Sequence, residues 1–354
     1  MGKLRHRILV VATSRNTRGG ITSVVKSHEK GDFWTLYRIK WIETHIDRGI
    51  LWKLLYFCRA LLQYLFYIPF ADIVHIHLST TVSLYRKSVF FLIAKIWQKK
   101  IIIHFHSSVP EVLYMKQNKF LYRYLFRNSE YVLVLSNQWK KWVLDALGDI
   151  PNIKVLYNPV VLENSKLNIS QVKKKKQILF AGSIIDRKGY KDLIRAFSLV
   201  SEKYQDWNLI FAGNGEIDKG LALVNELNLS GRVFFKGWVS GNEKQLLFAE
   251  SSIFCLTSYS EGFPMAVLDA WAYNLPVICT PVGGLPDFVV DKENAVIYPV
   301  GDVEALASAL DLFINNVSLR ESISISAKKM SDEVFHLDII NSQISKLYEE
   351  LLSK

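Results

Sequence analysis

Short apolar runs alternate with longer segments of helical pattern along the chain, and this series occurs twice. A short apolar run bounded by polar residues is typical of a strand buried on both faces, and such strands pair in parallel beneath the helices that connect them. The alternation therefore predicts an α/β protein with doubly wound parallel sheets. In the first half the expected elements are strands at Ile8–Ala12, Ile73–His77, Ile101–His106 and Tyr131–Ser136, and helices at Val82–Gln98 and Lys119–Arg127.

The polar stretch Glu163–Gln177 separates the two series and contains the basic run Lys173–Lys176, which we interpret as a solvated connector. The series then restarts with a helix expected at Tyr190–Tyr204 and strands at Gln177–Gly182, Trp207–Gly213, Arg232–Gly237, Ser252–Thr257 and Pro276–Thr280. We therefore predict one domain over residues 1–162, a linker over 163–176 and a second domain over 177–337. Two such halves predict a cleft between them, with ligands at the carboxyl ends of the strands.

Charge is distributed unevenly between the two halves. Residues 1–160 contain 24 Lys+Arg and 9 Asp+Glu, whereas residues 161–354 contain 20 and 24, so the net charge of +11 comes from the first half. This asymmetry indicates that the first half meets a polyanion or an anionic surface. The most apolar long window, Leu51–Phe70, contains Lys53, Arg59 and Gln63, and we do not expect it to span a membrane.

The N-terminus and the cysteines favour a cytoplasmic protein. The apolar run Ile8–Ala12 is too short for the core of a signal peptide. The three cysteines are scattered at Cys58, Cys255 and Cys279, which argues against a disulfide framework and favours a reducing compartment.

Three loops at the expected strand ends of the second half suit a phosphorylated ligand. In the first, Arg187 and Lys188 precede a helix start, where free N–H groups favour an anion, although a solvated basic loop would look the same. In the second, Gly213 and Gly215 either let a ligand approach the backbone or form a tight turn. The third, Gly237–Val239, offers main chain to a base, and its Trp238 is either a packed side chain or a stacking platform.

The fourth loop, Ser258–Asp269, is the most specific. Pro264 suits the first position of a helix that runs through Ala272. Glu261 and Asp269 stand eight residues apart, so they reach different parts of one ligand, and their carboxylates accept hydrogen bonds from hydroxyl groups. The pattern indicates a polyol ligand. The alternative is that Glu261 caps the helix and Asp269 is a surface acid.

The segment from Gly262, with Ala270–Ala272 and Leu275–Asp287, resembles the retaining glycosyltransferases of family 4. The resemblance covers nearly the whole chain and implies the GT-B fold, with two Rossmann-like domains facing a central cleft. It also implies that a last helix, within residues 338–354, packs back on the first domain. The family hallmark is Glu, seven residues, then Glu, whereas this chain has Glu261 and the shorter Asp269.

The resemblance implies a role for each matching residue. Glu261 would hold hydroxyls of the donor sugar, Asp269 the ribose hydroxyls and Lys188 the diphosphate. Ser183 stands where the family has an arginine, and Arg187 is a possible substitute. The full expected donor-binding set is Gly19, Gly20, Ser183, Arg187, Lys188, Gly213, Gly215, Gly237, Trp238, Val239, Glu261, Gly262, Phe263, Pro264, Met265 and Asp269.

Histidines end two strands of the first half. His106 matches the family histidine that touches the donor sugar near the reacting carbon, so the expected catalytic residues are His106, Glu261 and Lys188. His77 and Ser107 are weaker candidates for the acceptor side, and we interpret His75 and His104 as structural. Paired histidines suggest zinc, but no third ligand is evident from the sequence. The resemblance implies that neither a metal nor another cofactor is needed.

The expected reaction moves a sugar from a nucleotide diphosphate to an acceptor with retention of anomeric configuration. Preorganised donors stabilise charge on the leaving diphosphate, and its oxygen takes the acceptor proton. The sequence does not specify the sugar, the base or the acceptor. We expect a lipid-diphosphate-linked or saccharide acceptor in cell-surface polysaccharide or glycolipid synthesis. A nucleotide-sugar 2-epimerase and a non-catalytic partner in a polysaccharide assembly complex are the alternatives.

Basic and aromatic residues intermingle in the first half, within Leu51–Phe57, Tyr64–Tyr67, Val82–Lys100 and Lys116–Arg127. Such surfaces suit anionic lipid headgroups. No nucleic-acid motif is present. We therefore expect peripheral attachment to the cytoplasmic face of a membrane, although aromatic residues facing the core beside solvated basic faces would give the same pattern.

Overall fold

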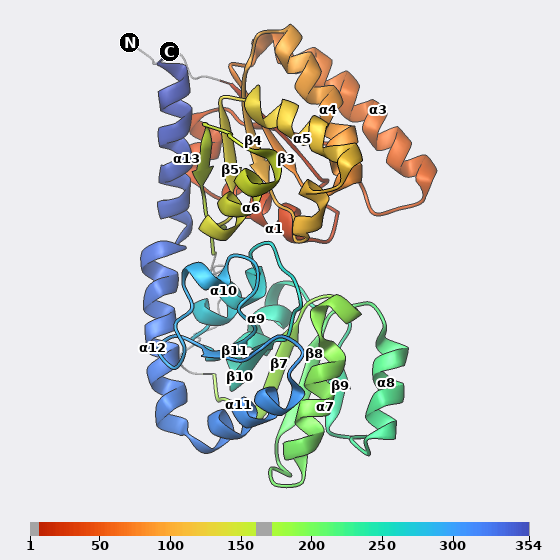
Figure 1. Ribbon diagram of the computed structural model, residues 1–354, viewed down its shortest axis with the longest axis vertical. Coiled ribbons are helices and arrows are strands. Elements are labelled where there is room, and N and C mark those ends of the chain that lie inside the picture. The colour runs from red at the N-terminus through yellow and green to blue at the C-terminus, as the bar shows by residue number, and fades with distance from the viewer. Residues whose placement is uncertain (1–6, 161–171, 354) are drawn as a thin grey trace. The chain divides into compact units, whose positions relative to one another are not determined.

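The computed structural model describes residues 7–160 and 172–353, so most of the expected linker over residues 163–176 lies outside the described residues. The chain forms two compact units, and we describe each by itself (Figure 1). Unit 1 comprises residues 1–159 and 335–354, and unit 2 comprises residues 160–334.

Unit 1 is built on a parallel sheet of six strands in the order β2-β1-β3-β4-β5-β6. These strands are β1 (Ile8–Ala12), β2 (Lys40–Glu43), β3 (Ile73–Leu78), β4 (Lys100–Phe105), β5 (Tyr131–Val134) and β6 (Ile153–Val155). The helices are α1 (Gly20–Glu29), α2 (Asp32–Leu36), α3 (Ile50–Tyr67), α4 (Thr81–Ile96), α5 (Lys116–Arg127), α6 (Asn137–Leu147) and α13 (Leu337–Leu352). Sequence reasoning did not find β2 or β6, and it placed His106 inside a strand that ends at Phe105.

Helix α13 covers one face of the unit 1 sheet. Its apolar residues recur at helical spacing, at Ile340, Ile344, Leu347, Tyr348 and Leu351, and all five are buried in the core that the sheet forms with α1 and α2. Burial of an apolar side chain contributes roughly 1.5–3 kcal/mol. The packing of α13 is therefore part of the core of unit 1 and not a peripheral contact.

Helices α3, α4 and α5 lie next to one another in unit 1, as Figure 1 shows in orange and yellow. The ring of Phe90 in α4 contacts that of Tyr64 in α3 at 5.0 Å, and Phe91 in α4 contacts Tyr124 in α5 at 6.2 Å. These aromatic side chains therefore hold the three helices together. Among the described residues, no helix combines the length and apolar character that a membrane span requires.

Unit 2 contains a second parallel sheet of six strands, in the order β12-β11-β10-β7-β8-β9. The strands are β7 (Gln177–Ala181), β8 (Asn208–Ala212), β9 (Val233–Phe235), β10 (Ile253–Leu256), β11 (Val277–Cys279) and β12 (Val296–Ile297). The helices are α7 (Tyr190–Ser201), α8 (Ile217–Glu226), α9 (Gly241–Glu250), α10 (Met265–Ala272), α11 (Val303–Asn315) and α12 (Val317–Val334). The two sheets confirm the predicted doubly wound α/β class.

Candidate functional site

The strand order of unit 2 reverses between β7 and β10, which are hydrogen-bonded neighbours. In doubly wound sheets, ligands bind at the carboxyl ends of the strands beside such a reversal. The loops that leave β7 and β10 there are residues 182–189 and 257–264, which are the first and fourth loops of the sequence analysis. The topology therefore brings together the two loops that carry most of the expected donor-binding residues.

A buried ion pair joins these two loops. Lys188 Nζ donates to Glu261 Oε1, and the two side chains are 18% and 7% exposed. Ser258 Oγ donates to the same carboxylate oxygen at 2.6 Å. Sequence reasoning named Lys188 and Glu261 separately, and the structure places them in contact.

Main-chain bonds also fix the two loops to each other. The amide of Tyr259 donates to the carbonyl of Arg187 at 2.8 Å, and Thr257 Oγ1 donates to the carbonyl of Lys188 at 2.8 Å. The Arg187 guanidinium donates to the carbonyl of Ser260, while Ser183 lies exposed in the same loop. The cations of the first loop are therefore held in place and are not a freely solvated basic segment.

The glycines of the second loop are explained by loop packing. A Cβ atom at Gly213 would lie 1.7 Å from the carbonyl oxygen of Gly182, and one at Gly215 would lie 2.2 Å from that of Ile184. The backbone at Gly215 also has φ +141°, which other residues rarely adopt. The tight-turn interpretation thus accounts for both glycines without a ligand.

The third loop leaves its tryptophan at the surface. Trp238 is 47% exposed, so it is not a core side chain, and it lies between the half-buried residues Gly237 and Val239. Whether Trp238 serves mainly for packing stays open. Whether its ring stacks on a base stays a prediction.

Helix α10 begins one residue later than predicted. Pro264 has ψ 100° and occupies the N-cap, while Met265 is the first helical residue. No side chain caps this helix, so Glu261 is not its cap. The Phe263 ring is buried edge-on against Phe288 at 5.7 Å. Contact between the main chain of this turn and a ligand stays a prediction.

Asp269 lies in α10 and forms an ion pair that sequence reasoning missed. Lys244 Nζ of α9 donates to Asp269 Oδ2 at 2.6 Å. The Asp269 side chain is 17% exposed, so it is not the free surface acid of the alternative interpretation. No motif marks Lys244, because it stands 25 residues earlier on another helix.

The strand order of unit 1 reverses at β1 and β3, and the expected site residues of this unit follow these strands and β4. Gly19 is the N-cap of α1, no side chain caps the helix, and no acidic residue occurs in its first turn. A Cβ atom at Gly19 or Gly20 would meet no atom within 4 Å. The first amides of α1 therefore remain accessible to an anion.

Four histidines form a patch on one face of the unit 1 sheet. We call His75, His77, His104 and His106 the histidine patch. His77 of β3 is in register with His104 of β4. His77 Nδ1 and His106 Nε2 are 2.9 Å apart, and His75 Nδ1 is 2.8 Å from the hydroxyl of Tyr348 in α13.

Burial keeps the histidine patch neutral. Desolvation lowers the pKa of His75 to about 3 and those of the other three well below the usual range. The positive charge of the buried Lys87, which donates to the carbonyl of His77, further lowers the pKa of His106. Neutral imidazole is also the form that binds metal ions, so the patch must be tested as a metal site.

Three ligand nitrogens, from His75, His77 and His104, lie within 4.8 Å of one another. The sequence expectation that no third ligand is evident is therefore wrong. However, two of the patch nitrogens have partners within the chain, because His75 Nδ1 contacts the hydroxyl of Tyr348 and His77 Nδ1 contacts His106 Nε2. That the protein needs no metal stays a prediction.

His77 and Ser107, the candidates for the acceptor side, are both buried. Ser107 Oγ accepts from the amide of Val109 at 3.2 Å and donates to its carbonyl at 3.0 Å. Their side chains therefore make internal contacts in the ligand-free chain. Their proposed contact with an acceptor stays a prediction.

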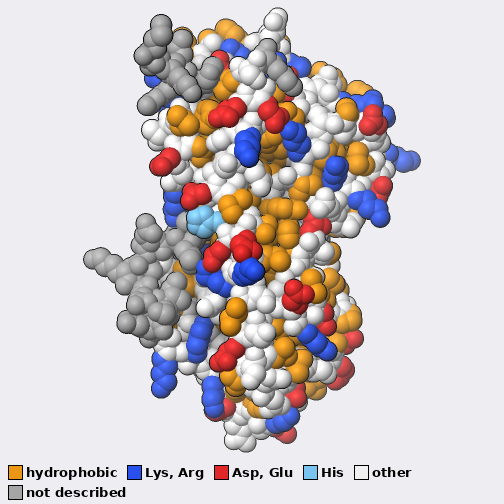
Figure 2. All heavy atoms as spheres, turned by 90° about the vertical axis from the view of Figure 1, so that its left-hand side faces the viewer, with side chains coloured by type: hydrophobic (Ala, Val, Ile, Leu, Met, Phe, Trp, Pro, Cys, Tyr) orange, Lys and Arg blue, Asp and Glu red, His pale blue; other side chains and the backbone are white. Residues whose placement is uncertain are grey.

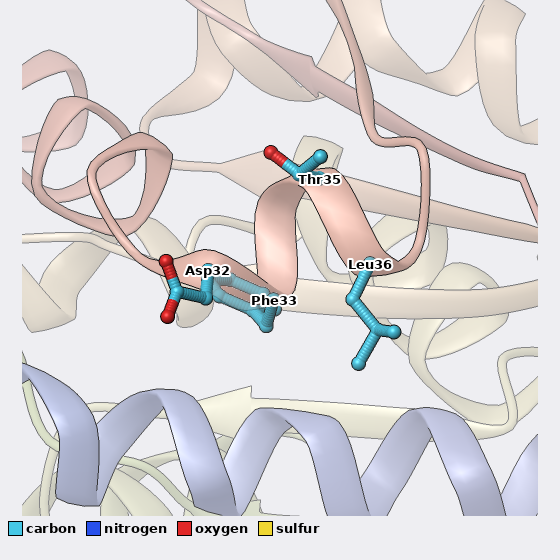
Figure 3. A pocket seen from close by; sticks show the side chains of 4 residues that line it. All are labelled: Asp32, Phe33, Thr35 and Leu36. Carbon is cyan, nitrogen blue, oxygen red and sulfur yellow. The ribbon is translucent and has the colours of Figure 1, made fainter.

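An open pocket of about 470 Å³ lies over α2 and is lined by Asp32, Phe33, Thr35 and Leu36 (Figure 3). The Phe33 ring lies 6.4 Å from that of Tyr348, so it belongs to the packing of α13. Asp32 is the single charged residue among the four. The pocket does not coincide with any strand end that carries the site, and we assign no ligand to it.

Comparison with known proteins identifies the chain. Residues 163–330 match the model of the glycosyl transferases group 1, and residues 2–164 match the model of glycosyltransferase family 4. The chain belongs to this family of glycosyltransferases. It has the GT-B fold, as the crystal structure of Anabaena HepE in complex with UDP-glucose does. That structure matches with a TM-score of 0.78 and 19% identity, over 97% of this chain and 99% of the other.

Curated relatives of this chain include an uncharacterized glycosyltransferase of Haemophilus influenzae, 33% identical over 45% of each chain. Another is the capsular polysaccharide biosynthesis glycosyltransferase CapM of Staphylococcus aureus, 26% identical over 63% of this chain and 59% of the relative. The chain spans about half the length of the first of these relatives.

Proposed function

We propose that the protein transfers a sugar from a nucleotide diphosphate sugar to an acceptor, with retention of configuration. The observation that carries the proposal is the Lys188–Glu261 pair at the reversal of strand order in unit 2. This pair offers a cation to a diphosphate and a carboxylate to sugar hydroxyls at the place where such sheets bind ligands. HepE, a structural neighbour, was crystallised with UDP-glucose, which supports a nucleotide-sugar donor.

In the proposed complex, Lys188 turns from Glu261 to an oxygen of the diphosphate. The carboxylate of Glu261, still fixed by Ser258, accepts hydrogen bonds from the sugar hydroxyls. The amides at the start of α10, which no side chain caps, face the diphosphate, because the N-terminus of a helix favours an anion. We propose that the first amides of α1, which no side chain caps either, also bind an anionic group. Asp269, held by Lys244, receives the ribose hydroxyls.

The reaction breaks the bond between the anomeric carbon and the diphosphate oxygen and forms one between that carbon and the acceptor oxygen. We propose that the acceptor attacks from the leaving-group face and that its proton passes to the departing phosphate oxygen. Charge on that oxygen is stabilised by Lys188 and by main-chain amides, which act as preorganised donors. These groups supply the positive charge that a metal ion would otherwise provide, so we propose that the reaction needs no metal and no other cofactor.

We further propose that unit 1 docks reversibly on the cytoplasmic leaflet and takes a lipid-diphosphate-linked or saccharide acceptor. Helices α3, α4 and α5 contain two, three and four Lys or Arg residues and no acidic residue, and Lys87 of α4 is the buried one among them. Residues 50–55 at the start of α3 are all exposed, and Ile50 is 87% exposed. An exposed apolar segment beside cations suits insertion among anionic headgroups.

The face of unit 1 that carries α13 does not share this combination of cations and exposed apolar residues. Figure 2 shows acidic and basic side chains intermixed over the face that carries α13. The proposed docking surface is therefore confined to α3, α4 and α5. CapM, a relative, is named for capsular polysaccharide synthesis, which supports an acceptor made at a cell envelope.

Membrane docking is tested by flotation with liposomes that contain or lack anionic lipid. We expect recovery with anionic liposomes, loss of recovery in a Leu51→Ser, Leu54→Ser, Leu55→Ser variant, and no effect of Leu199→Ser, an exposed leucine of α7 in unit 2. Equal recovery with both liposome types, or none, would contradict the proposal.

The activity is tested with a panel of nucleotide sugars, each incubated with the protein and with or without an extract of membrane lipids and saccharide acceptors. We expect one donor to release its nucleoside diphosphate in proportion to a new glycosylated product. Release without an acceptor would indicate the epimerase. No release with any donor, together with retained binding to a partner after Glu261→Ala, would indicate a non-catalytic role.

A further inference from the structure

The histidine patch contains one direct contact between imidazoles. His77 Nδ1 and His106 Nε2 are within hydrogen-bond distance at 2.9 Å, and the two rings are stacked at 16°. The main chain supports the same contact, because the amide of His106 donates to the carbonyl of Leu78 at 2.7 Å and thereby pairs the ends of β3 and β4. Both rings are therefore attached to a fixed backbone.

This contact couples the tautomers of the two residues. A neutral imidazole has one N–H donor and one acceptor nitrogen, so one of the two facing nitrogens must donate and the other must accept. The buried surroundings lower the pKa of both rings and so oppose an added proton on either one. The two tautomers are therefore linked, because a proton on His77 Nδ1 requires His106 to carry its own proton on Nδ1.

His106 is also the residue of the patch that reaches the surface. It is partly exposed, whereas His75, His77 and His104 are buried. Its Nε2 is occupied by His77, which leaves Nδ1 as the ring nitrogen that can meet a ligand. Whether Nδ1 presents a donor or an acceptor then depends on the proton at the buried nitrogen.

We propose that His77 is a positioning residue that fixes the ring orientation and the single tautomer with which His106 meets the donor sugar. The inference rests on the proposed contact between His106 and that sugar. It replaces a role at the acceptor, because a buried imidazole acts through its neighbour. His75, two residues earlier on the same face of β3, packs its ring against His77, but its Nδ1 contacts the hydroxyl of Tyr348 of α13 and not His77 or His106.

Two nearly isosteric variants separate the hydrogen bond from the packing. His77→Asn retains an amide group near the position of Nδ1, whereas His77→Leu fills similar space without a polar atom. We expect His77→Leu to lower kcat at least about tenfold with little change in the KM for the donor, because a misplaced group near the reacting atoms costs up to about 10²-fold. His77→Asn should retain at least about a third of wild-type kcat.

His75→Leu is the matched control, because His75 and His77 are equally buried on the same strand. It should keep wild-type kcat, whatever its effect on stability. A kcat of His75→Leu as low as that of His77→Leu, or equal kcat values for His77→Leu and His77→Asn, would overturn the proposal. Thermal unfolding of each variant establishes that folded proteins are compared.

The tautomer itself is measured without any substrate. Long-range ¹H–¹⁵N correlation spectra of the ¹⁵N-histidine-labelled protein should show one protonated and one unprotonated ring nitrogen for His106, and averaged shifts in His77→Leu. Unchanged His106 shifts in that variant would refute the positioning role. By contrast, wild-type turnover of His106→Ala would refute the sugar contact and with it the proposed role of His106, while the spectra would still report the tautomer.

Discussion

The two units present different chemistry at the carboxyl ends of similar sheets. In unit 2, the buried ion pair of Lys188 and Glu261 lies where the strand order reverses. A second ion pair joins Lys244 of α9 to Asp269 of α10. Unit 1 instead carries neutral imidazoles and an open glycine turn before α1. Charges that neutralise each other can be exchanged for those of a ligand, whereas neutral rings contribute shape and hydrogen-bond direction. We therefore propose that diphosphate binding falls mainly to unit 2.

The helices that cover the two sheets also differ in charge. No acidic residue occurs in α3, α4 or α5 of unit 1, whereas α7, α8 and α9 of unit 2 each contain acidic residues. These three helices of unit 1 contribute +9 to the sequence charge of +15 in residues 1–160. The outer helices of unit 2 therefore carry charges of both signs, whereas those of unit 1 carry cations and exposed apolar side chains.

The largest effect that tests this comparison is expected at Glu261. Glu261→Gln keeps the shape and the contact with Ser258 but removes the charge that pairs with Lys188. We expect kcat to fall by roughly 10²–10³-fold, the scale seen when one preorganised electrostatic group is removed. Steady-state assays with the donor found in the panel measure the effect. Glu333→Gln, at an exposed position of α12, is the control and should turn over normally.

The packing of the unit 2 loops predicts the next largest effect. Gly213→Ala places a Cβ atom against the Gly182 carbonyl, so we expect the free energy of unfolding to fall by about 3 kcal/mol, as for other overpacked sites. Gly182→Ala meets only the Phe180 ring at 3.7 Å and should cost less than about 1 kcal/mol. Urea denaturation compares the two. Similar costs for both would mean that the loops tolerate displacement.

The neutral histidines of unit 1 predict a smaller, pH-dependent effect. A histidine with a lowered folded pKa stabilises the fold above its unfolded pKa of about 6.5, and this stability is lost as pH falls below that value. With a folded pKa of about 3, His75 should account for about 1 kcal/mol of the stability lost between pH 7.0 and pH 5.5.

Urea midpoints of wild type and His75→Asn at the two pH values measure this contribution. The variant should lose less stability than wild type on acidification. His336→Asn, which retains a capping side chain at an exposed helix start, should behave like wild type. A pH dependence unchanged by His75→Asn would show that another group is responsible.

The smallest effect is expected at Lys244. Lys244→Met leaves Asp269 without its ion-pair partner, and we expect the donor KM to rise about threefold while kcat stays constant, because the contact binds substrate and transition state alike. Lys203→Met, which breaks an exposed pair with Asp311 far along the chain from the loops, is the matched control. A fall in kcat at Lys244 would place this residue closer to the reacting atoms than we propose.

Much of this fold follows from the sequence. Strands such as β1, β3 and β7 were predicted almost to the residue, because continuous apolar runs arise where both faces of a strand are covered. The strands β2 and β12 were missed because they are edge strands of only four and two residues, and their sequences resemble loops. The GT-B prediction is confirmed by both sheets and by the comparison with HepE.

Site residues that are close in sequence could be predicted. Contacts between residues on different helices or strands could not, because they depend on how those elements pack. The loop around Glu261 was found because its glycine, proline and acidic residues are adjacent. The pairing of Asp269 with Lys244 and of His77 with His106 could not be read from spacing, since each depends on how two elements pack. Pro264 shows the same limit, because its φ suits both the N-cap and the first helical position.

The discontinuous composition of unit 1 has a consequence for biosynthesis. Unit 2 is one uninterrupted stretch, so all of it is synthesised before α13. Unit 1 starts first but lacks one layer of its core until residues 337–352 emerge. Until then, its apolar sheet face stays open to water and to other nascent chains, which is when chaperones would be most needed.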